Sequence, residues 1–273
     1  MPNCCVASGG RRRIEVGGFS PRRGHGMFRA AWNQGDENMI QLYAMGSPNV
    51  VKVYVALEEM GLPYAVTPVD VFGGQQFSAD FVRLNPNAKV PVIHDPDGLG
   101  GPRTVFESGA ILMYLAEKSG KFLPTDPASR YDVLQWLMVQ MTGLGPMSGQ
   151  LVHFLRFAPA GNDYAKSRYA TQVRRVYESL DQRLAGNAFL GGAKYSIADM
   201  ATFPWTRMAE MLLGEDAKNY PNVLRWNAAV GARPAVQRAL AQADAVRTVT
   251  TQFDKAEAEK VDRMMGRGQY ALA

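Results

Sequence analysis

Apolar residues follow two patterns along the chain after Met39: short unbroken runs, and stripes at helical spacing. The run MIQLYAM at residues 39–45 predicts a short buried strand. Ser47 and Pro48 then open a segment that we expect to be helical as far as Gly61. Its apolar positions fall at i, i+3, i+4 and i+7: Val50, Val53, Tyr54 and Leu57.

Three further runs and one more helical stripe complete the first part of the chain. The runs at 63–71, 90–93 and 104–106 predict strands, and the turn-rich stretch HDPDGLGGPR separates the last two. The segment SGAILMYLAEKSG, residues 108–120, predicts a helix. The order β-α-β followed by β-β-α predicts a small α+β domain over residues 39–120.

Beyond the Pro-containing linker KFLPTDPASR, the periodic segments have helical spacing. The expected helices are 128–157, 163–186, 196–212, 220–232 and 233–245. Gly143, Gly145 and Pro146 should kink or break the first of them. The pattern therefore predicts an all-α domain at 127–242, followed by a polar tail, 243–273, with little periodicity.

Charge and composition exclude several classes of protein. The net charge is +5, but residues 1–38 hold six arginines and three acidic residues and so account for +3 of it. The rest of the chain has both signs interspersed, which argues against a nucleic-acid-binding surface. No apolar run approaches the ~18 residues of a membrane helix. We therefore expect neither a nucleic-acid partner nor a membrane span.

The leader, residues 1–38, is rich in Gly and Arg and has no apolar core of a secretory signal, so we expect either a disordered extension or an upstream start ahead of a natural start at Met39. Both cysteines, Cys4 and Cys5, lie within it, and the three histidines have no ligand spacing. Neither a disulfide framework nor a metal site is expected. A reducing cytoplasm fits this composition best.

Three motifs in the α+β domain could carry chemistry. In NPNAKVPVI, Pro91 opens a strand, and a cis Val90–Pro91 bond would leave the Val90 backbone free to pair with a peptide; an ordinary trans proline is the alternative. In VFESGAIL, Ser108 is a natural N-cap that could receive a carboxylate, beside Glu107, which could accept from an ammonium. A capped helix preceded by a surface glutamate is the structural alternative.

The third motif is the Ser-Pro-Asn at the start of the first helix. Ser47 is the expected N-cap, Pro48 suits the first helical position, and Asn49 lies in the first turn. A sulfur anion placed there would meet the helix dipole, free amides, a hydroxyl and an amide NH₂, which together lower a thiol pKa. Alternatively, Ser47 only caps the helix. In the helical half, Ser196 and Asp199 of YSIADM form a structural capping box.

In this order, the motifs resemble the soluble glutathione transferase superfamily over residues 39–242. NPNAKVPVI with VFESGAILMYLAEKSG is similar to its thioredoxin-like, glutathione-binding half, and YSIADM to a motif of its helical half. The stretches SPNVVKV, GGQQF, LQWLMVQMTGLGPMSGQ and YAKSRY most resemble the bacterial nu class. Those proteins are disulfide-bond reductases that use glutathione and lack a catalytic cysteine.

The resemblance implies a thioredoxin-like domain at 39–120, a homodimer, and roles for particular residues. Asn49, with Ser47, would hydrogen-bond the glutathione sulfur, and Val90 would pair with the cysteinyl backbone beside cis-Pro91. The rest of the tripeptide would be held by Glu107, Ser108, Gln76 and Lys89. Arg168 would meet a second glutathione or the neighbouring subunit's site. Departures from the class at GQLVHFLRFAP predict a different second-substrate pocket, formed by His153, Phe154 and Arg156.

Three functions follow as hypotheses. The first is a glutathione-dependent reductase of small disulfides, in which glutathione brings the reactive sulfur as co-substrate and no metal takes part. The second is conjugation of glutathione to small electrophiles. The third, a non-catalytic interaction module, is disfavoured because Ser47, Asn49, Pro91, Glu107 and Ser108 occur together.

Overall fold

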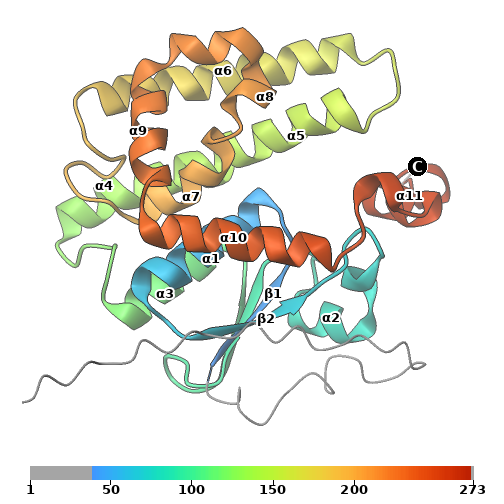
Figure 1. Ribbon diagram of the computed structural model, residues 1–273, viewed down its shortest axis with the longest axis horizontal. Helices are drawn as coiled ribbons and strands as arrows, with labels where there is room; N and C mark the ends of the chain where they lie inside the picture. Colours follow the sequence, from blue (N-terminus) through green and yellow to red (C-terminus); the bar gives the residue numbers. More distant parts are fainter. Residues whose placement is uncertain (1–38, 272–273) are drawn as a thin grey trace, which may run out of the picture.

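The computed structural model describes residues 39–271. Figure 1 shows two parts, one above the other. A small sheet with its helices forms the lower part, and a layer of helices forms the upper part. The expectations for residues 1–38 lie outside the described residues. The element order confirms an α+β thioredoxin-like domain followed by a helical domain.

The sheet has four strands in the order β2-β1-β3-β4. These are β1 Ile40–Ala44, β2 Tyr64–Pro68, β3 Val92–Asp95 and β4 Arg103–Phe106. Strands β1 and β2 are parallel, as a crossover through a helix requires, whereas β1–β3 and β3–β4 are antiparallel. The four strand positions expected from the apolar runs are therefore confirmed.

Alternate residues of the central strands bury opposite faces of the sheet. Leu42 and Ile93, which pair in register, join the main core with α1 and α3, whereas Tyr43 and Val92 join a second cluster beneath α2. The helices are α1 Pro48–Met60, α2 Ala79–Leu84 and α3 Ser108–Ser119, with the short η1 Gln75–Phe77 before α2. The apolar pattern did not predict α2, because six residues are too few to show a helical period.

Helix α1 begins and ends where local chemistry dictates. Pro48 takes the first position, where its missing N–H costs nothing, and Gly61 ends the helix with φ 72°, a left-handed conformation that favours glycine. Val53, Tyr54 and Leu57 are completely buried. Each such side chain stabilises the fold by roughly 1.5–3 kcal/mol relative to exposure.

The helical domain follows the segment 120–126. Its elements are α4 Pro127–Met138, η2 Val139–Leu144, α5 Gly145–Arg156, α6 Asp163–Ala185, α7 Ile197–Thr206, α8 Ala209–Leu213, η3 Gly214–Asn219, α9 Pro221–Gly231 and α10 Pro234–Thr248. The expected interruption near Gly143 is a π-helical turn, η2, which joins α4 to α5. The single helix expected over 196–212 is two helices, α7 and α8, separated at Arg207–Met208.

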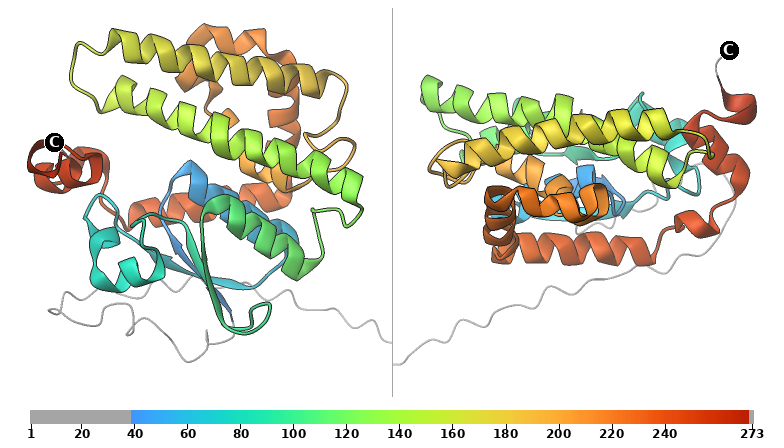
Figure 2. Two further views of the ribbon diagram at one scale, coloured as in Figure 1. Left: turned by 180° about the vertical axis from the view of Figure 1, so that it is seen from behind. Right: turned by 90° about the horizontal axis from the view of Figure 1, so that it is seen from above.

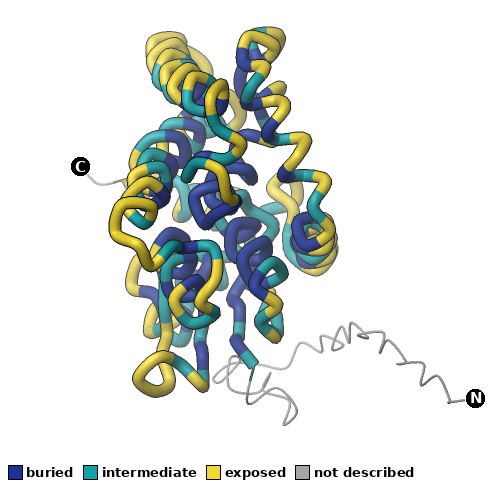
Figure 3. The backbone as a smooth tube through the Cα atoms, turned by 90° about the vertical axis from the view of Figure 1, so that its left-hand side faces the viewer, coloured by how far each residue is buried: buried dark blue, intermediate teal, exposed yellow. Residues whose placement is uncertain are grey.

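Helix α10 runs antiparallel to α1 and ties the two parts together, since Arg233 at its start meets Glu59 near the end of α1 and Arg247 near its end meets Gly46 before α1. It packs along α1, and Figure 1 shows it below α6. Arg233 pairs with the buried carboxylate of Glu59 at 2.5 and 2.9 Å, and its guanidinium lies 4.0 Å from the centre of the Tyr195 ring. The buried residues form a band through both domains, as the dark segments in Figure 3 show.

The C-terminal segment is more ordered than its polar sequence suggested. It contains η4 Phe253–Lys255, α11 Ala258–Met265 and η5 Gly268–Tyr270. In both side views it lies beyond the end of α10, above α2 (Figures 1 and 2).

Candidate functional site

The start of α1 carries donors that no described protein group uses. The Ser47 carbonyl accepts from the backbone N–H groups of Val50 and Val51, both at 3.0 Å, so Ser47 occupies the N-cap position as expected. Its hydroxyl makes no capping hydrogen bond, however. The side chain therefore remains free to face a ligand at the positive end of the helix dipole.

Asn49 is fixed by a residue from the helical domain. The indole N–H of Trp205, on α7, donates to Asn49 Oδ1 at 3.0 Å. Asn49 is half-buried, and among residues 39–271 its amide NH₂ has no acceptor. The Ser-Pro-Asn motif predicted Asn49 in the site, but no short motif could indicate Trp205, since the two residues lie 156 positions apart.

The loop before β3 has the conformation that the glutathione-binding motif implies. The Val90–Pro91 peptide bond is cis. The buried side chain of Asn85 shapes this loop, since its Nδ2 donates to the Lys89 carbonyl at 2.7 Å and its Oδ1 accepts from the Asn87 N–H at 3.0 Å. The Lys89 side chain is exposed and Val90 is half-buried at the rim.

The start of α3 differs by one residue from the expectation. Glu107, and not Ser108, holds the N-cap position, and Ser108 is the first residue of the helix. Glu107 has φ 69°, which is uncommon for a residue with a side chain and costs on the order of 1–2 kcal/mol. Such backbone outliers cluster at ligand sites, and this one leaves Glu107 exposed beside the buried Ser108.

A buried lysine lies behind Ser108. Lys52 is 1% exposed, and its Nζ lies 3.2 Å from Ser108 Oγ and 2.7 Å from Gln140 Oε1 of η2. Burial lowers the pKa of Lys52 to about 7, and the negative charge of Glu107 opposes that shift. Lys52 was not among the residues expected at the site. The available signal was its spacing, since a residue three positions after Asn49 lies on the same face of α1.

The C-terminal segment contacts the loop that contains Gln76. Gln76 is buried and its Oε1 has no partner among the described residues. Asp70 binds the loop through the Gly73 N–H at 2.9 Å and binds the C-terminal segment through the Thr251 hydroxyl at 2.6 Å. The Arg263 guanidinium of α11 lies 4.4 Å from the centre of the Phe77 ring, next to Gln76.

A pocket of about 410 Å³ lies between α5 and α11. It is lined by Gly149, Gln150, His153, Phe157, Met264 and Met265. Of the three pocket residues expected from the sequence, His153 is in this lining. Phe154 stacks instead on Tyr169, with ring centres 5.5 Å apart, and Arg156 is exposed at the end of α5.

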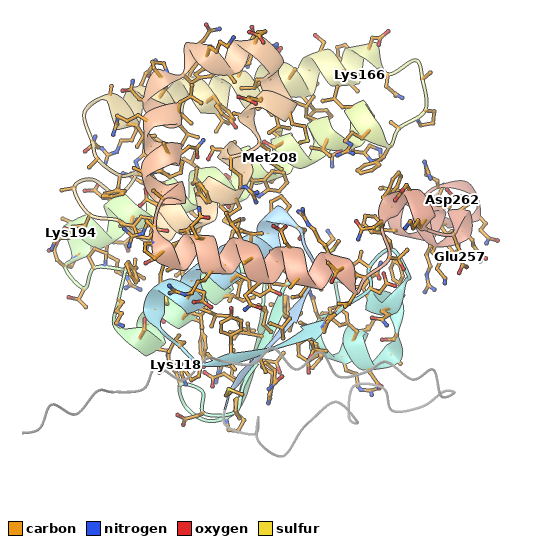
Figure 4. The ribbon with its side chains drawn as sticks, viewed as in Figure 1. Lys118, Lys166, Lys194, Met208, Glu257 and Asp262 are labelled. Carbon is orange, nitrogen blue, oxygen red and sulfur yellow. The ribbon has the colours of Figure 1, made fainter. Side chains whose placement is uncertain are left out.

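The methionines of this pocket come from the segment expected to be a polar tail with little periodicity. Aromatic contacts hold that segment in place: Phe253 meets Phe157 and Phe72, with ring centres 4.5 and 5.6 Å apart. Figure 4 places Glu257 and Asp262 of the same segment at the right-hand side of the view. Val261, which is buried, lies three and four positions before the two methionines, and this helical spacing is the apolar signal that could have indicated α11.

Arg168 is exposed on α6 and, among the residues that the structure describes, makes no hydrogen bond or ion pair with the other expected site residues. Helix α6 packs on α5, α8, α9 and η2.

Residues 39–271 contain no group of three His, Cys, Asp or Glu side chains that could hold a metal ion. In the same residues, no helix is long and apolar enough to cross a membrane. They also contain no cysteine. The chemistry available around the α1 start is therefore that of hydrogen-bond donors, a helix dipole and a nearby buried cation.

Two family models match the chain. The model for the N-terminal domain of glutathione S-transferase matches residues 46–118, and the model for the C-terminal domain matches residues 144–234. The chain is 44% identical to disulfide-bond oxidoreductase YfcG of Escherichia coli over 207 residues, which are 75% of this chain and 96% of that relative. It is 41% identical over 214 residues to disulfide-bond oxidoreductase YghU of the same organism, covering 73% of each chain.

Solved structures with glutathione bound are similar over the same region. A glutathione transferase family member from Pseudomonas fluorescens, with two glutathione molecules bound, is 45% identical with a TM-score of 0.72, over 75% of this chain and 93% of that one. A glutathione transferase from Pseudomonas putida, with one glutathione disulfide bound per subunit, is 44% identical with a TM-score of 0.70, over 74% and 91%.

Proposed function

Because this chain belongs to the glutathione S-transferase family, we propose that it is a glutathione-dependent disulfide-bond reductase without a catalytic cysteine. The observation that carries the proposal is the α1 start, where the Ser47 hydroxyl and the Asn49 NH₂ are unused donors and no cysteine lies in residues 39–271. The names of the relatives and the glutathione disulfide bound to one similar structure support reduction over other reactions.

In this proposal, glutathione brings the sulfur and Asn49, with Ser47, keeps it ionised. A thiolate at a helix N-terminus is stabilised by the dipole and by each donor that it meets, so its pKa falls from the ordinary ~8.5 toward neutrality. Thiolate fraction and access govern disulfide exchange, so no general base is needed. Donors that are fixed before the substrate arrives are what this step requires.

The rest of the tripeptide would extend from this sulfur across the thioredoxin-like domain. Val90, beside cis-Pro91, would pair with the cysteinyl backbone, and Glu107 with Ser108 would hold the γ-glutamyl ammonium and carboxylate. Gln76 and Lys89 would lie toward the glycyl end. The buried charge of Lys52, 3.2 Å from the Ser108 hydroxyl, would favour a carboxylate there.

The reaction consists of two exchanges. The first glutathione thiolate attacks one sulfur of the substrate disulfide, which forms a mixed disulfide and expels the other sulfur as a thiolate. A second glutathione thiolate then attacks the glutathione sulfur of the mixed disulfide and releases glutathione disulfide and the second substrate thiolate. Two glutathiones thus supply two electrons, and the two product thiolates take up the protons that the glutathione thiols lost.

A second candidate, conjugation of glutathione to small electrophiles, is favoured by the pocket at α5 and α11. Its lining of His153, Phe157, Met264 and Met265 offers an apolar wall to an aromatic electrophile. The same thiolate would serve both reactions. Arg168 is proposed to meet a carboxylate either of a second glutathione or, in a homodimer, at the neighbouring subunit's site, and a reducing cytoplasm would suit the reaction.

The test compares the turnover of a small symmetric disulfide with that of an aromatic chloride, each with glutathione. We expect the disulfide to be turned over faster. Turnover of the chloride alone would assign the conjugating function, and glutathione binding with neither turnover would sink both. Absence of glutathione binding would leave the third hypothesis, a non-catalytic module.

A further inference from the structure

The contact between Trp205 and Asn49 fixes which edge of an amide faces the site. Nε1 of an indole carries a hydrogen and can only donate, whereas an asparagine amide has an acceptor oxygen on one side and a two-hydrogen donor on the other. At 3.0 Å from the indole nitrogen, the amide atom must be the acceptor. The NH₂ of Asn49 is therefore held on the side away from Trp205.

This orientation matters because an amide turned the other way would oppose a thiolate. Its oxygen would then face a negatively charged sulfur and would raise the thiol pKa instead of lowering it. A free asparagine can exchange the two edges by rotating its terminal torsion, which is broad and roughly two-fold. A fixed donor behind the amide removes that freedom before glutathione binds.

Trp205 is itself held rigidly. It is 7% exposed on α7, and the start of that helix is fixed by the buried Asp199 carboxylate, which accepts from the Ser196 N–H at 2.9 Å. The edge of the indole ring lies against α5 at Gly149, where an added Cβ would come within 3.6 Å of the ring. The indole N–H is thus a preorganised donor supplied by the helical domain.

We propose that Trp205 is a positioning residue that orients the Asn49 amide with its NH₂ toward the glutathione sulfur, so that the helical domain takes part in activating the thiol. The inference rests on the proposed role of Asn49 at that sulfur. Trp205 acts through Asn49 and makes no contact with the reacting atoms itself. Its removal should therefore matter only while Asn49 is present.

The experiment measures the pKa of the glutathione thiol bound to the full chain, from the ultraviolet absorbance of the thiolate against pH, together with kcat and KM for a small disulfide. The Trp205→Phe variant keeps an aromatic ring but loses the N–H. We expect a higher thiol pKa, a kcat lowered about 3- to 10-fold, and little change in the KM for glutathione. Trp136→Phe, at a half-buried tryptophan of α4, is the matched control and should leave all three unchanged.

The same measurements in an Asn49→Ala background separate positioning from general damage. There, Trp205→Phe should have no further effect on the thiol pKa or kcat. An effect of equal size in both backgrounds, or no effect of Trp205→Phe in the wild-type chain, overturns the inference. If Asn49→Ala alone leaves the thiol pKa unchanged, the proposed role of Asn49 fails, and the inference fails with it for that separate reason.

An Asn49→Asp variant tests the same geometry should Trp205→Phe fold poorly. Its carboxylate still accepts from Trp205, but it presents an oxygen where the NH₂ had been. We expect a bound-thiol pKa above that of Asn49→Ala, because an acceptor is worse for a thiolate than an empty space. A thiol pKa in Asn49→Asp as low as in the wild type would overturn the inference.

Discussion

Lys52 Nζ lies 2.7 Å from Gln140 Oε1, and this buried contact joins the first helix of the thioredoxin-like domain to the π-helical turn of the helical domain. The same ammonium also reaches the Ser108 hydroxyl at the proposed glutamyl end of the site. Glu107 is the charged group that acts on it, from the start of α3. One side chain therefore connects the binding residues of α3 with the domain interface.

Replacement of Lys52 should change how stability depends on pH. Its pKa is about 7 when folded and ordinarily 10.5, so between these values the unfolded chain holds a proton that the folded chain has released. The Lys52 contribution to the free energy of unfolding therefore rises with pH from about 7 to 10.5 and is constant below 7. Lys52→Met lacks it, so the wild type should gain stability relative to the variant as pH rises.

Urea unfolding of both chains at several values between pH 7 and pH 9.5 gives this difference directly. Lys121→Met is the control, since Lys121 is exposed and donates to the Met60 carbonyl at 2.9 Å. Parallel stability profiles for the wild type and Lys52→Met would show that Lys52 stays charged in the folded chain. The variant should also bind glutathione more weakly, with a KM raised several-fold, because Ser108 loses its hydrogen bond with Lys52.

The fold was predictable where short-range chemistry decides it. Ser47, Pro48 and Gly61 set both ends of α1, and the apolar runs gave the four strands. Helix α2 was missed because its signals are Ser78, whose hydroxyl accepts from the Phe81 N–H at 3.3 Å, and only one fully buried apolar residue. A single buried position has no period to detect.

Only the candidate site residues that lie within short contiguous motifs could be predicted from the sequence. Ser47–Asn49, Val90–Pro91 and Glu107–Ser108 each lie in one short stretch, although their roles toward glutathione stay predictions. Trp205 and Lys52 make contacts that exist only after the domains pack. In sequence Trp205 reads as an ordinary core residue and Lys52 as an ordinary surface residue. The methionines of α11 were missed because that helix buries little of its own surface.

Asn49→Ala should lower disulfide turnover more than Ser47→Ala. Asn49 offers an oriented NH₂, whereas the Ser47 hydroxyl can rotate and is held by no protein partner in the described residues. Losing one oriented donor to a charged sulfur corresponds to about 1.5–3 kcal/mol, or roughly 10- to 150-fold in rate. Steady-state kcat at saturating glutathione measures it. Small and equal losses would mean that backbone amides and the helix dipole do most of the activation.

Asp199→Ala should destabilise the helical domain strongly. The carboxylate accepts from the Leu190 N–H, the Ser196 N–H and hydroxyl, and the Trp226 indole N–H, at 2.9–3.0 Å. Its loss leaves several buried donors without an acceptor, at a cost of about 2–5 kcal/mol. Urea unfolding should show this. Asp216→Ala removes a half-exposed ion pair with Arg174 and, as the control, should cost less than about 1 kcal/mol.

Asp199 should also give stability an acidic pH dependence. Burial raises its pKa to about 6 from the ordinary 3.8, although its hydrogen bonds oppose the shift. Between these values the folded chain holds a proton that the unfolded chain has lost, so the Asp199 contribution to stability falls as pH rises from about 4 to 6. The difference in free energy of unfolding between the wild type and Asp199→Asn isolates this contribution. A difference that does not vary with pH would place the pKa near its ordinary value.

Phe253→Ala should loosen the C-terminal segment and alter the second-substrate pocket. The Phe253 ring joins Phe157 of the α5 end to Phe72 of the loop before η1, and no other aromatic ring of residues 249–271 makes such a contact. Without it, Met264 and Met265 should lie over the pocket for less of the time. We expect faster proteolysis within residues 249–271 and a higher KM for small aromatic electrophiles, with the KM for glutathione changed less. Val249→Ala, at a residue half-exposed at the end of α10, is the matched control. If both variants are cut at the wild-type rate, then the ring pair does not hold the segment, and the hydrogen bonds from Thr251 to Asp70 are sufficient to do so.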